Sequence, residues 1–185
     1  MSSISPTLQD ITESHERIRL YIHRTPVLQS TSLSELAECD IYFKCENFQK
    51  IGAFKARGGI NAVLKLSNEA QKKGLTTHSS GNHAQAIALA AKAVGTTAYI
   101  VMPSNAPKIK KTGVKALGGK IIECEPTLAA RENGVQKIIE ETGATFVHPF
   151  DNDDVIAGQA TSAKEMIEDC GFFDIMMAPV GGGGL

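Results

Sequence analysis

Short apolar runs alternate with longer segments of helical spacing through most of this chain. The short runs predict strands at residues 41–45, 75–78, 97–102, 120–124, 145–147 and 174–180. Apolar positions that recur every three or four residues predict helices at residues 56–66, 82–94, 107–117, 127–141 and 155–170. Strands that alternate with helices are typical of βαβ units. The pattern therefore predicts an α/β fold in which open parallel sheets are flanked by helices.

The same spacing makes predictions about helix ends and faces. Apolar residues between positions 11 and 22 predict a first amphipathic helix. Ser32 is expected to cap a short helix at residues 33–37, because serine side chains accept hydrogen bonds from the first free amides of a helix. In the basic helix predicted at residues 107–117, Ile109 is expected to face the core.

The composition fits a globular protein. Of the 185 residues, 42% are apolar and 21% are charged, which is enough to form one domain or two small lobes. The net charge of −1 gives no electrostatic reason to bind nucleic acid or an anionic membrane. No apolar run is long enough to span a bilayer and no signal peptide is recognisable, so a cytoplasmic location is expected. Four cysteines lack metal-ligand spacing and are expected to be reduced and mostly buried: Cys39, Cys45, Cys124 and Cys170.

A single lysine stands between glycines at the expected start of a helix. Lys55 follows the apolar Phe54 within the run Gly52-Ala53-Phe54-Lys55-Ala56-Arg57-Gly58. Burial would lower the pKa of the Lys55 amine and free it to attack an aldehyde. A lysine at a helix start is more often a solvated surface charge, so these residues alone leave both interpretations open.

Two loops lie beyond the carboxyl ends of predicted strands, where parallel sheets bind ligands. The run Ser79-Ser80-Gly81-Asn82-His83 precedes a helix, whose free amides and dipole attract anions. The alternative is an ordinary capping turn in which Ser80 or Asn82 caps the helix and His83 is structural. Four glycines at residues 181–184 follow the last predicted strand and offer either a cradle of amides for phosphate or a flexible tail.

Together, these runs resemble those of fold-type II pyridoxal phosphate enzymes. The closest resemblance is to the group of serine racemase, threonine (serine) dehydratase and threo-3-hydroxyaspartate dehydratase. The supporting runs begin at Arg24, Phe43, Ala53, Ser79, Ile156 and Pro179. The resemblance implies a tryptophan synthase β-like fold with a small domain at residues 51–150. Residues 1–50 and 151–185 would then form part of a large domain, which is incomplete because relatives continue past the glycines.

The resemblance also implies a role for each residue of the three runs. Lys55 resembles the lysine that binds the cofactor through its amine and then acts as a base on one face of the substrate. Ser80 resembles the serine that acts on the opposite face. Phe54 would flank the cofactor ring, and Asn82 would bind the ring hydroxyl. The phosphate would lie on Gly181, Gly182, Gly183 and Gly184. The residues that would receive the substrate carboxylate are Ser79, Ser80, Asn82 and His83.

The implied activity is racemization, β-elimination, or both, of a hydroxy amino acid. Serine is the favoured substrate, with threonine and threo-3-hydroxyaspartate close behind. The implied cofactor is pyridoxal 5′-phosphate; the resemblance adds a divalent metal (Mg or Ca) held outside this chain, and ATP. The implied assembly is a homodimer or an association with a completing chain, with no nucleic acid and no membrane as partner. The alternative is a truncated, non-catalytic pseudoenzyme that binds or regulates a full-length homologue.

Overall fold

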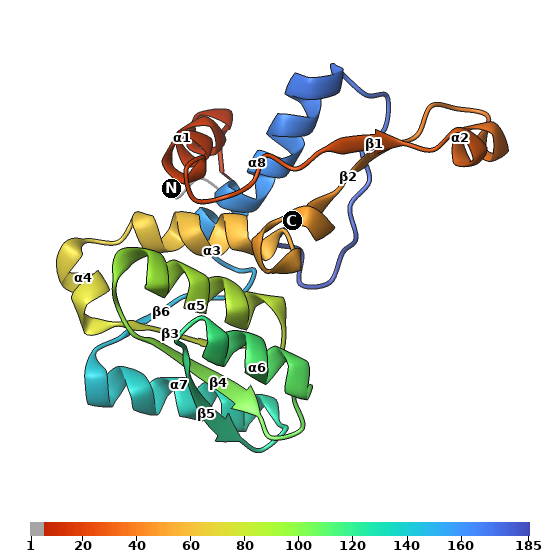
Figure 1. The fold of residues 1–185 in the computed structure, drawn as a ribbon. Helices are drawn as coiled ribbons and strands as arrows, with labels where there is room; N and C mark the ends of the chain where they lie inside the picture. Colours follow the sequence, from red (N-terminus) through yellow and green to blue (C-terminus); the bar gives the residue numbers. More distant parts are fainter. Residues whose placement is uncertain (1–5) are drawn as a thin grey trace.

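A four-stranded parallel sheet is the largest sheet of the described residues and lies below α3 in the view of Figure 1. The structure is a computed structural model that describes residues 6–185. The strand order is β5-β4-β3-β6, and all three pairings are parallel. The strands are β3 (Leu75–His78), β4 (Ala98–Pro103), β5 (Lys120–Cys124) and β6 (Thr145–Phe146). The predicted α/β fold with a helix-flanked parallel sheet is confirmed.

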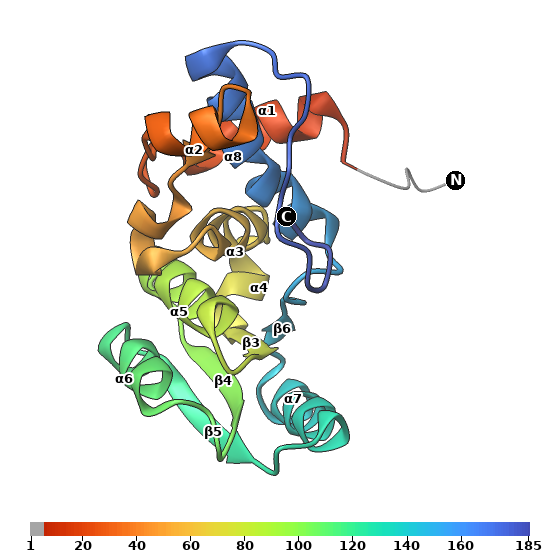
Figure 2. The ribbon, with the colours of Figure 1, turned by 90° about the vertical axis from the view of Figure 1, so that its right-hand side faces the viewer.

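Helices cover both faces of this sheet. Helices α5 (Asn82–Val94) and α6 (Lys108–Ala116) lie on one face, and α7 (Leu128–Thr142) lies on the other (Figure 2). The short helix α4 (Asn68–Lys73) leads into β3. Alanines on the buried side of α5 allow that helix to lie close to the strands, and Val135 and Ile138 of α7 fill the opposite side.

A second helical layer lies on α5, away from the sheet. Helix α3 (Lys55–Leu64) packs on α5, and α8 (Asp153–Cys170) and α1 (Leu8–Ile18) pack on α3 (Figure 1). One continuous core cluster joins Ile18 of α1 through Ile60 of α3 to Ile87 of α5. The core therefore crosses the predicted boundary between the small and large domains. That division of the chain stays a prediction.

The crossing of α3 and α8 depends on glycine. A Cβ atom on Gly158 would lie 2.7 Å from the Cα of Gly58 and 2.8 Å from the carbonyl oxygen of Arg57. Gly158→Ala is expected to lower the free energy of unfolding by up to about 2 kcal/mol, because an overpacking cost of roughly 1–3 kcal/mol is offset by a helix-propensity gain of about 1 kcal/mol. Urea titration measures this loss. Gly181→Ala is the control, because a Cβ atom there meets open space; equal stability of both variants would contradict the prediction.

An arm projects from the helical layer. Strand β1 (Val27–Gln29) pairs antiparallel with β2 (Tyr42–Lys44), and α2 (Thr31–Ala37) lies at the tip (Figure 1). Two short 3₁₀ turns, η1 (Glu46–Phe48) and η2 (Lys50–Gly52), connect β2 to α3. No helix in residues 6–185 combines the length and the apolar character that a membrane crossing requires.

Four expectations drawn from the sequence pattern were wrong. Residues 174–180 form no strand, because no described strand lies beside them to complete a hydrogen-bonded ladder. Ser30, not Ser32, caps α2 by accepting a hydrogen bond from the Leu33 amide. Ile109 is 75% exposed, since Val114 is the residue that α6 buries. The cysteines are not mostly buried: Cys39 and Cys170 are exposed, and Cys45 and Cys124 are partly exposed.

Candidate functional site

Lys55 is the first residue of α3, and its amine is held away from bulk solvent. The side chain is half-buried, and its Nζ donates a hydrogen bond of 2.7 Å to the carbonyl oxygen of Pro149. The same Nζ lies 5.1 Å from the centre of the Phe54 ring. Burial lowers the pKa of Lys55 below its usual value, since a carbonyl partner supplies no full negative charge. The partial burial that would free the amine is therefore present, and the role of Lys55 as a nucleophile stays a prediction.

The backbone just before Lys55 is strained. Ile51 has φ 61° and Gly52 has φ 69°, so two successive residues occupy the left-handed region. A β-branched residue rarely adopts this conformation, at a cost of order 1–3 kcal/mol. The turn directs the chain from η2 into an extended Ala53 and then into α3. The strain is thus located where the chain must place Lys55.

The four glycines lie against the segment that holds the lysine. A Cβ atom on Gly182 would lie 2.4 Å from the ring of Phe150, and one on Gly184 would lie 2.8 Å from the Phe150 Cα. Within residues 6–185, no backbone amide of the glycine run donates a hydrogen bond. Phe150 follows Pro149, whose carbonyl accepts from Lys55. Both views show the chain end returning to the side of α3 (Figures 1 and 2).

The polar loop between β3 and α5 leaves the start of α5 uncapped. Gly81 occupies the N-cap position, and no side chain bonds to the first amides of the helix. The alternative in which Ser80 or Asn82 caps the helix is therefore wrong. Ser79 accepts a 3.2 Å hydrogen bond from the Gly81 amide, and Ser80 is exposed. The loop therefore combines uncapped helix amides with an accessible hydroxyl.

His83 is buried beneath the polar loop. Its side chain is 3% exposed, and Nε2 lies 3.1 Å from the carbonyl oxygen of Val147. Since a carbonyl only accepts, Nε2 carries the proton, and Nδ1 has no hydrogen-bond partner among the described residues. Burial lowers the pKa of His83 to about 4, although the bond to Val147 opposes the shift. A contact of His83 with substrate stays a prediction.

The buried histidine predicts a pH-dependent stability. The pKa of His83 is about 4 in the folded protein against 6.5 for an ordinary histidine, so its stabilisation is complete above pH 6.5. As the pH falls from 6.5 to 4, the unfolded chain binds a proton that the folded protein does not. The free energy of unfolding should fall by roughly 3 kcal/mol over that window. Urea titrations at several pH values measure the slope, and His83→Gln should flatten it. Parallel slopes for both proteins would contradict the assignment.

A buried ion network that sequence reasoning missed begins two residues after Lys55. Arg57 is fully buried and donates two hydrogen bonds of 2.8 Å to Glu46 and two more of 2.8 Å to Glu165.

Glu165 has two further partners. Lys44 approaches Glu165 to 2.8 Å, and His15 approaches it to 3.4 Å. The network thus ties α1, β2, η1 and α8 to the first turn of α3. The available signal was a charged residue among the small and apolar residues that follow Lys55 in α3.

The two ends of this network shift each other's pKa. Burial alone would raise the pKa of Glu165, but hydrogen bonds from Arg57 and Lys44 outweigh it and lower that pKa to about 2. Burial opposes the charge of Arg57, but Glu165 and Glu46 together raise the pKa of the guanidinium. Both groups therefore stay ionised at neutral pH.

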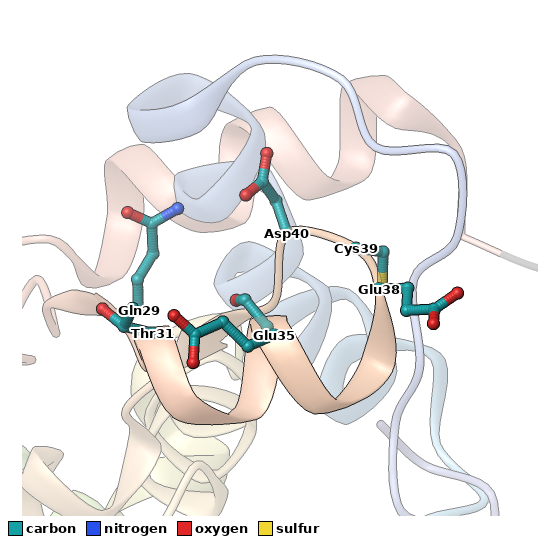
Figure 3. Close-up of a pocket in the computed structure, with 7 residues that line it drawn as sticks. Gln29, Thr31, Glu35, Glu38, Cys39 and Asp40 are labelled. Carbon is teal, nitrogen blue, oxygen red and sulfur yellow. The ribbon is translucent and has the colours of Figure 1, made fainter.

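A polar hollow lies over the tip of the arm, away from Lys55 (Figure 3). It contains none of the predicted site residues. Its lining consists of Gln29, Thr31, Ser34, Glu35, Glu38, Cys39 and Asp40. Nowhere in the described part of the chain do three or more His, Cys, Asp or Glu side chains gather in a way that could hold a metal ion.

Comparisons with known proteins agree with the fold and with the predicted resemblance. The profile of a family described as pyridoxal-phosphate dependent enzyme matches residues 18–185. A serine racemase of Dictyostelium discoideum is 47% identical over 97% of this chain and 55% of its own length. A beta-hydroxyaspartate dehydratase of Paracoccus denitrificans is 48% identical over 97% of this chain and 57% of its own length.

Solved structures show the same partial match. The structure of maize serine racemase superposes with a TM-score of 0.96, at 44% identity, over 97% of this chain and 55% of that one. The crystal structure of a threonine deaminase from T.th. superposes with a TM-score of 0.88, at 42% identity, over 97% of this chain and 58% of that one. The chain thus spans little more than half the length of these relatives.

Proposed function

The chain belongs to the family of pyridoxal-phosphate dependent enzymes, and we propose that its site serves racemization, β-elimination, or both, of a hydroxy amino acid. Serine is the first proposed substrate, and threonine and threo-3-hydroxyaspartate follow. Relatives named serine racemase and beta-hydroxyaspartate dehydratase support serine and threo-3-hydroxyaspartate as candidate substrates. A single methyl group separates serine from threonine and is worth only about 1–3 kcal/mol of discrimination. The choice between serine and threonine therefore depends on few contacts.

One observation carries the proposal, namely the half-buried amine of Lys55 bonded to the carbonyl of Pro149. The adjacent Phe150 packs against the glycine run, so the amine and the free amides of that run meet on one short segment. This donor set fits pyridoxal phosphate: an amine for the aldehyde, Asn82 for the ring hydroxyl, and unused amides for the phosphate. When bound, the cofactor supplies an electron sink for the bond cleavage.

The residues of this chain divide the proton transfers and the binding between them. Lys55 Nζ would take the α-proton on one face of the substrate, because its lowered pKa favours the neutral amine. Ser80 Oγ, exposed on the polar loop, would give a proton to the opposite face. The uncapped amides at the start of α5 would hold the substrate carboxylate. A base and an acid on opposite faces would permit racemization.

Borohydride trapping tests this proposal directly. The 185-residue chain is mixed with pyridoxal phosphate, reduced with borohydride and digested, and the modified peptide is identified by mass spectrometry. The expected result is one modified residue, Lys55, with visible absorption before reduction. A chain that gives no adduct at Lys55 would contradict the proposed function.

Ser80→Ala is expected to separate the two proposed reactions. The variant should lose racemization before it loses elimination, because only racemization needs a proton from the serine face. Chiral chromatography of serine and a keto-acid assay measure the two rates, and their ratio is independent of how much protein binds cofactor. Ser79→Ala, with the neighbouring hydroxyl removed, should keep the wild-type ratio. An unchanged ratio in Ser80→Ala would overturn its assigned role.

The remaining implications of the family stay predictions. They are regulation by a divalent metal (Mg or Ca) and by ATP, assembly as a homodimer or with a completing chain, a cytoplasmic location, and the division into domains at residues 51 and 150.

A further inference from the structure

We propose that Lys110 is a positioning residue that fixes which end of the Asn82 amide faces the cofactor ring. The inference rests on the proposed function and deepens it, because it assigns a residue of α6 to the site. Lys110 belongs to none of the three runs that indicate cofactor binding.

The contact itself is short and partly buried. Lys110 Nζ donates a hydrogen bond of 2.5 Å to Asn82 Oδ1. Asn82 is the first residue of α5, and Lys110 lies in the first turn of α6. Both side chains are half-buried, whereas Lys108 on the same helix is exposed. Lys110 is therefore directed at α5 and not at solvent.

The packing of α6 on α5 supports this contact. A Cβ atom on Gly113 would lie 2.6 Å from Gln85 Oε1, so the two helices approach closely at this point. Gly113 lies three residues after Lys110, and Gln85 lies three residues after Asn82. The two contacts thus repeat one turn apart along both helices. The register of the helices places Lys110 opposite Asn82.

The chemistry of the pair determines the orientation of the amide. A lysine ammonium is a donor only, whereas an asparagine amide has an acceptor end and a donor end. The ammonium therefore holds the oxygen end, because the flipped amide would set its N–H groups against another donor. The Nδ2 group is left as the donor for a third partner. A ring oxygen that receives this donor is stabilised in its anionic form.

The charge of Lys110 acts in the same direction as the hydrogen bond. An ammonium on Oδ1 polarises the amide and makes Nδ2 a stronger donor. Removing the ammonium should weaken the stabilisation of an anionic ring oxygen and allow the amide to turn over. The ring oxygen of a bound cofactor should then keep its proton up to a higher pH.

A pH titration of the visible absorption of the cofactor-loaded chain tests the inference. Lys110→Met should raise the midpoint by about one pH unit relative to wild type. Lys110→Arg should keep the midpoint close to that of wild type, because a guanidinium is also a donor only. Lys110→Gln is measured as well, in case the methionine variant does not fold, and should give an intermediate midpoint.

A matched control lies on the next residue. Lys111 is half-buried on the same helix but bonds to Glu123 and to the carbonyl oxygen of Ser104. Lys111→Met removes the same charge without touching Asn82, and its midpoint should equal that of wild type. A wild-type midpoint in both Lys110→Met and Lys110→Gln would overturn the inference. An equal shift in Lys111→Met would also overturn it, because general charge would then explain the effect.

The proposed function and the role of Lys110 are overturned by different results. Absence of a trapped adduct at Lys55 in wild type would overturn the proposed function. A trapped adduct with an unchanged titration in the Lys110 variants would overturn only this inference. In an Asn82→Ala background, Lys110→Met should cause no further shift; a full additional shift would show that Lys110 acts without Asn82.

Discussion

Lys55→Ala is expected to abolish the borohydride-trapped cofactor adduct completely, whereas Lys50→Ala should retain it. The physical reason is local: the Lys55 amine is half-buried, and burial lowers its pKa. Only a neutral amine attacks an aldehyde, so a lowered pKa raises the reactive fraction at a given pH. Lys50 lies five residues earlier, in η2, and is the nearby control, whereas the Lys55 amine is bonded to the carbonyl oxygen of Pro149.

Mass spectrometry of the reduced protein measures the adduct at each lysine. The pH dependence adds a second readout, since trapping at Lys55 should persist to lower pH than trapping at exposed lysines. Circular dichroism shows whether Lys55→Ala keeps the wild-type fold. Equal labelling of the two variants, or labelling spread over many lysines in wild type, would remove the basis for assigning Lys55.

Arg57→Met is expected to lower the free energy of unfolding by about 3–5 kcal/mol, the usual cost of removing one partner from a buried ion pair. Glu165 would keep Lys44 and His15 but lose two hydrogen bonds, and Glu46 would lose both of its bonds to the guanidinium. Arg57→Lys should recover little of this loss, because an ammonium cannot reproduce a fork that contacts two carboxylates.

The control for this prediction is a surface arginine. Arg24 contacts Glu168 and Asp169, and all three side chains are substantially exposed. Arg24→Met should cost no more than about 1 kcal/mol, as exposed ion pairs usually do. Urea titration of both variants gives the comparison. A loss below about 1 kcal/mol in Arg57→Met would show that the network does not hold α3.

The same network predicts a second pH window. The pKa of Glu165 is about 2 in the folded protein against 4.5 for an ordinary glutamate. Its contribution is therefore present above pH 4.5 and is lost as the pH falls toward 2, a window that overlaps that of His83 only at its upper end. Arg57→Met should reduce the slope between pH 4.5 and 2 and leave the slope between pH 6.5 and 4.5 unchanged.

The elements with a strong local pattern were predictable from the sequence. The helix at Asn82–Val94 and the strand at Lys120–Cys124 coincide with the predicted ranges. Their apolar residues recur with the period of the element, which depends only on neighbouring positions in the chain. The start of α3 was equally readable, since Lys55 follows a glycine turn and begins a helix as predicted. Short elements such as β1 and α4 carry too few residues to show a period.

The tertiary structure decided the features that depend on distant residues. Residues 174–180 have the composition of a strand, but a strand also needs a neighbour to bond, and none is present in residues 6–185. The partners of Arg57 and Lys110 come from segments far along the chain, so no local pattern announces them. The sequence by itself determined the α/β pattern and singled out one amine and two loops as candidates. Only folding decided how that amine is desolvated and which side chains hold the site in place, because burial and pairing arise from contacts between separate elements.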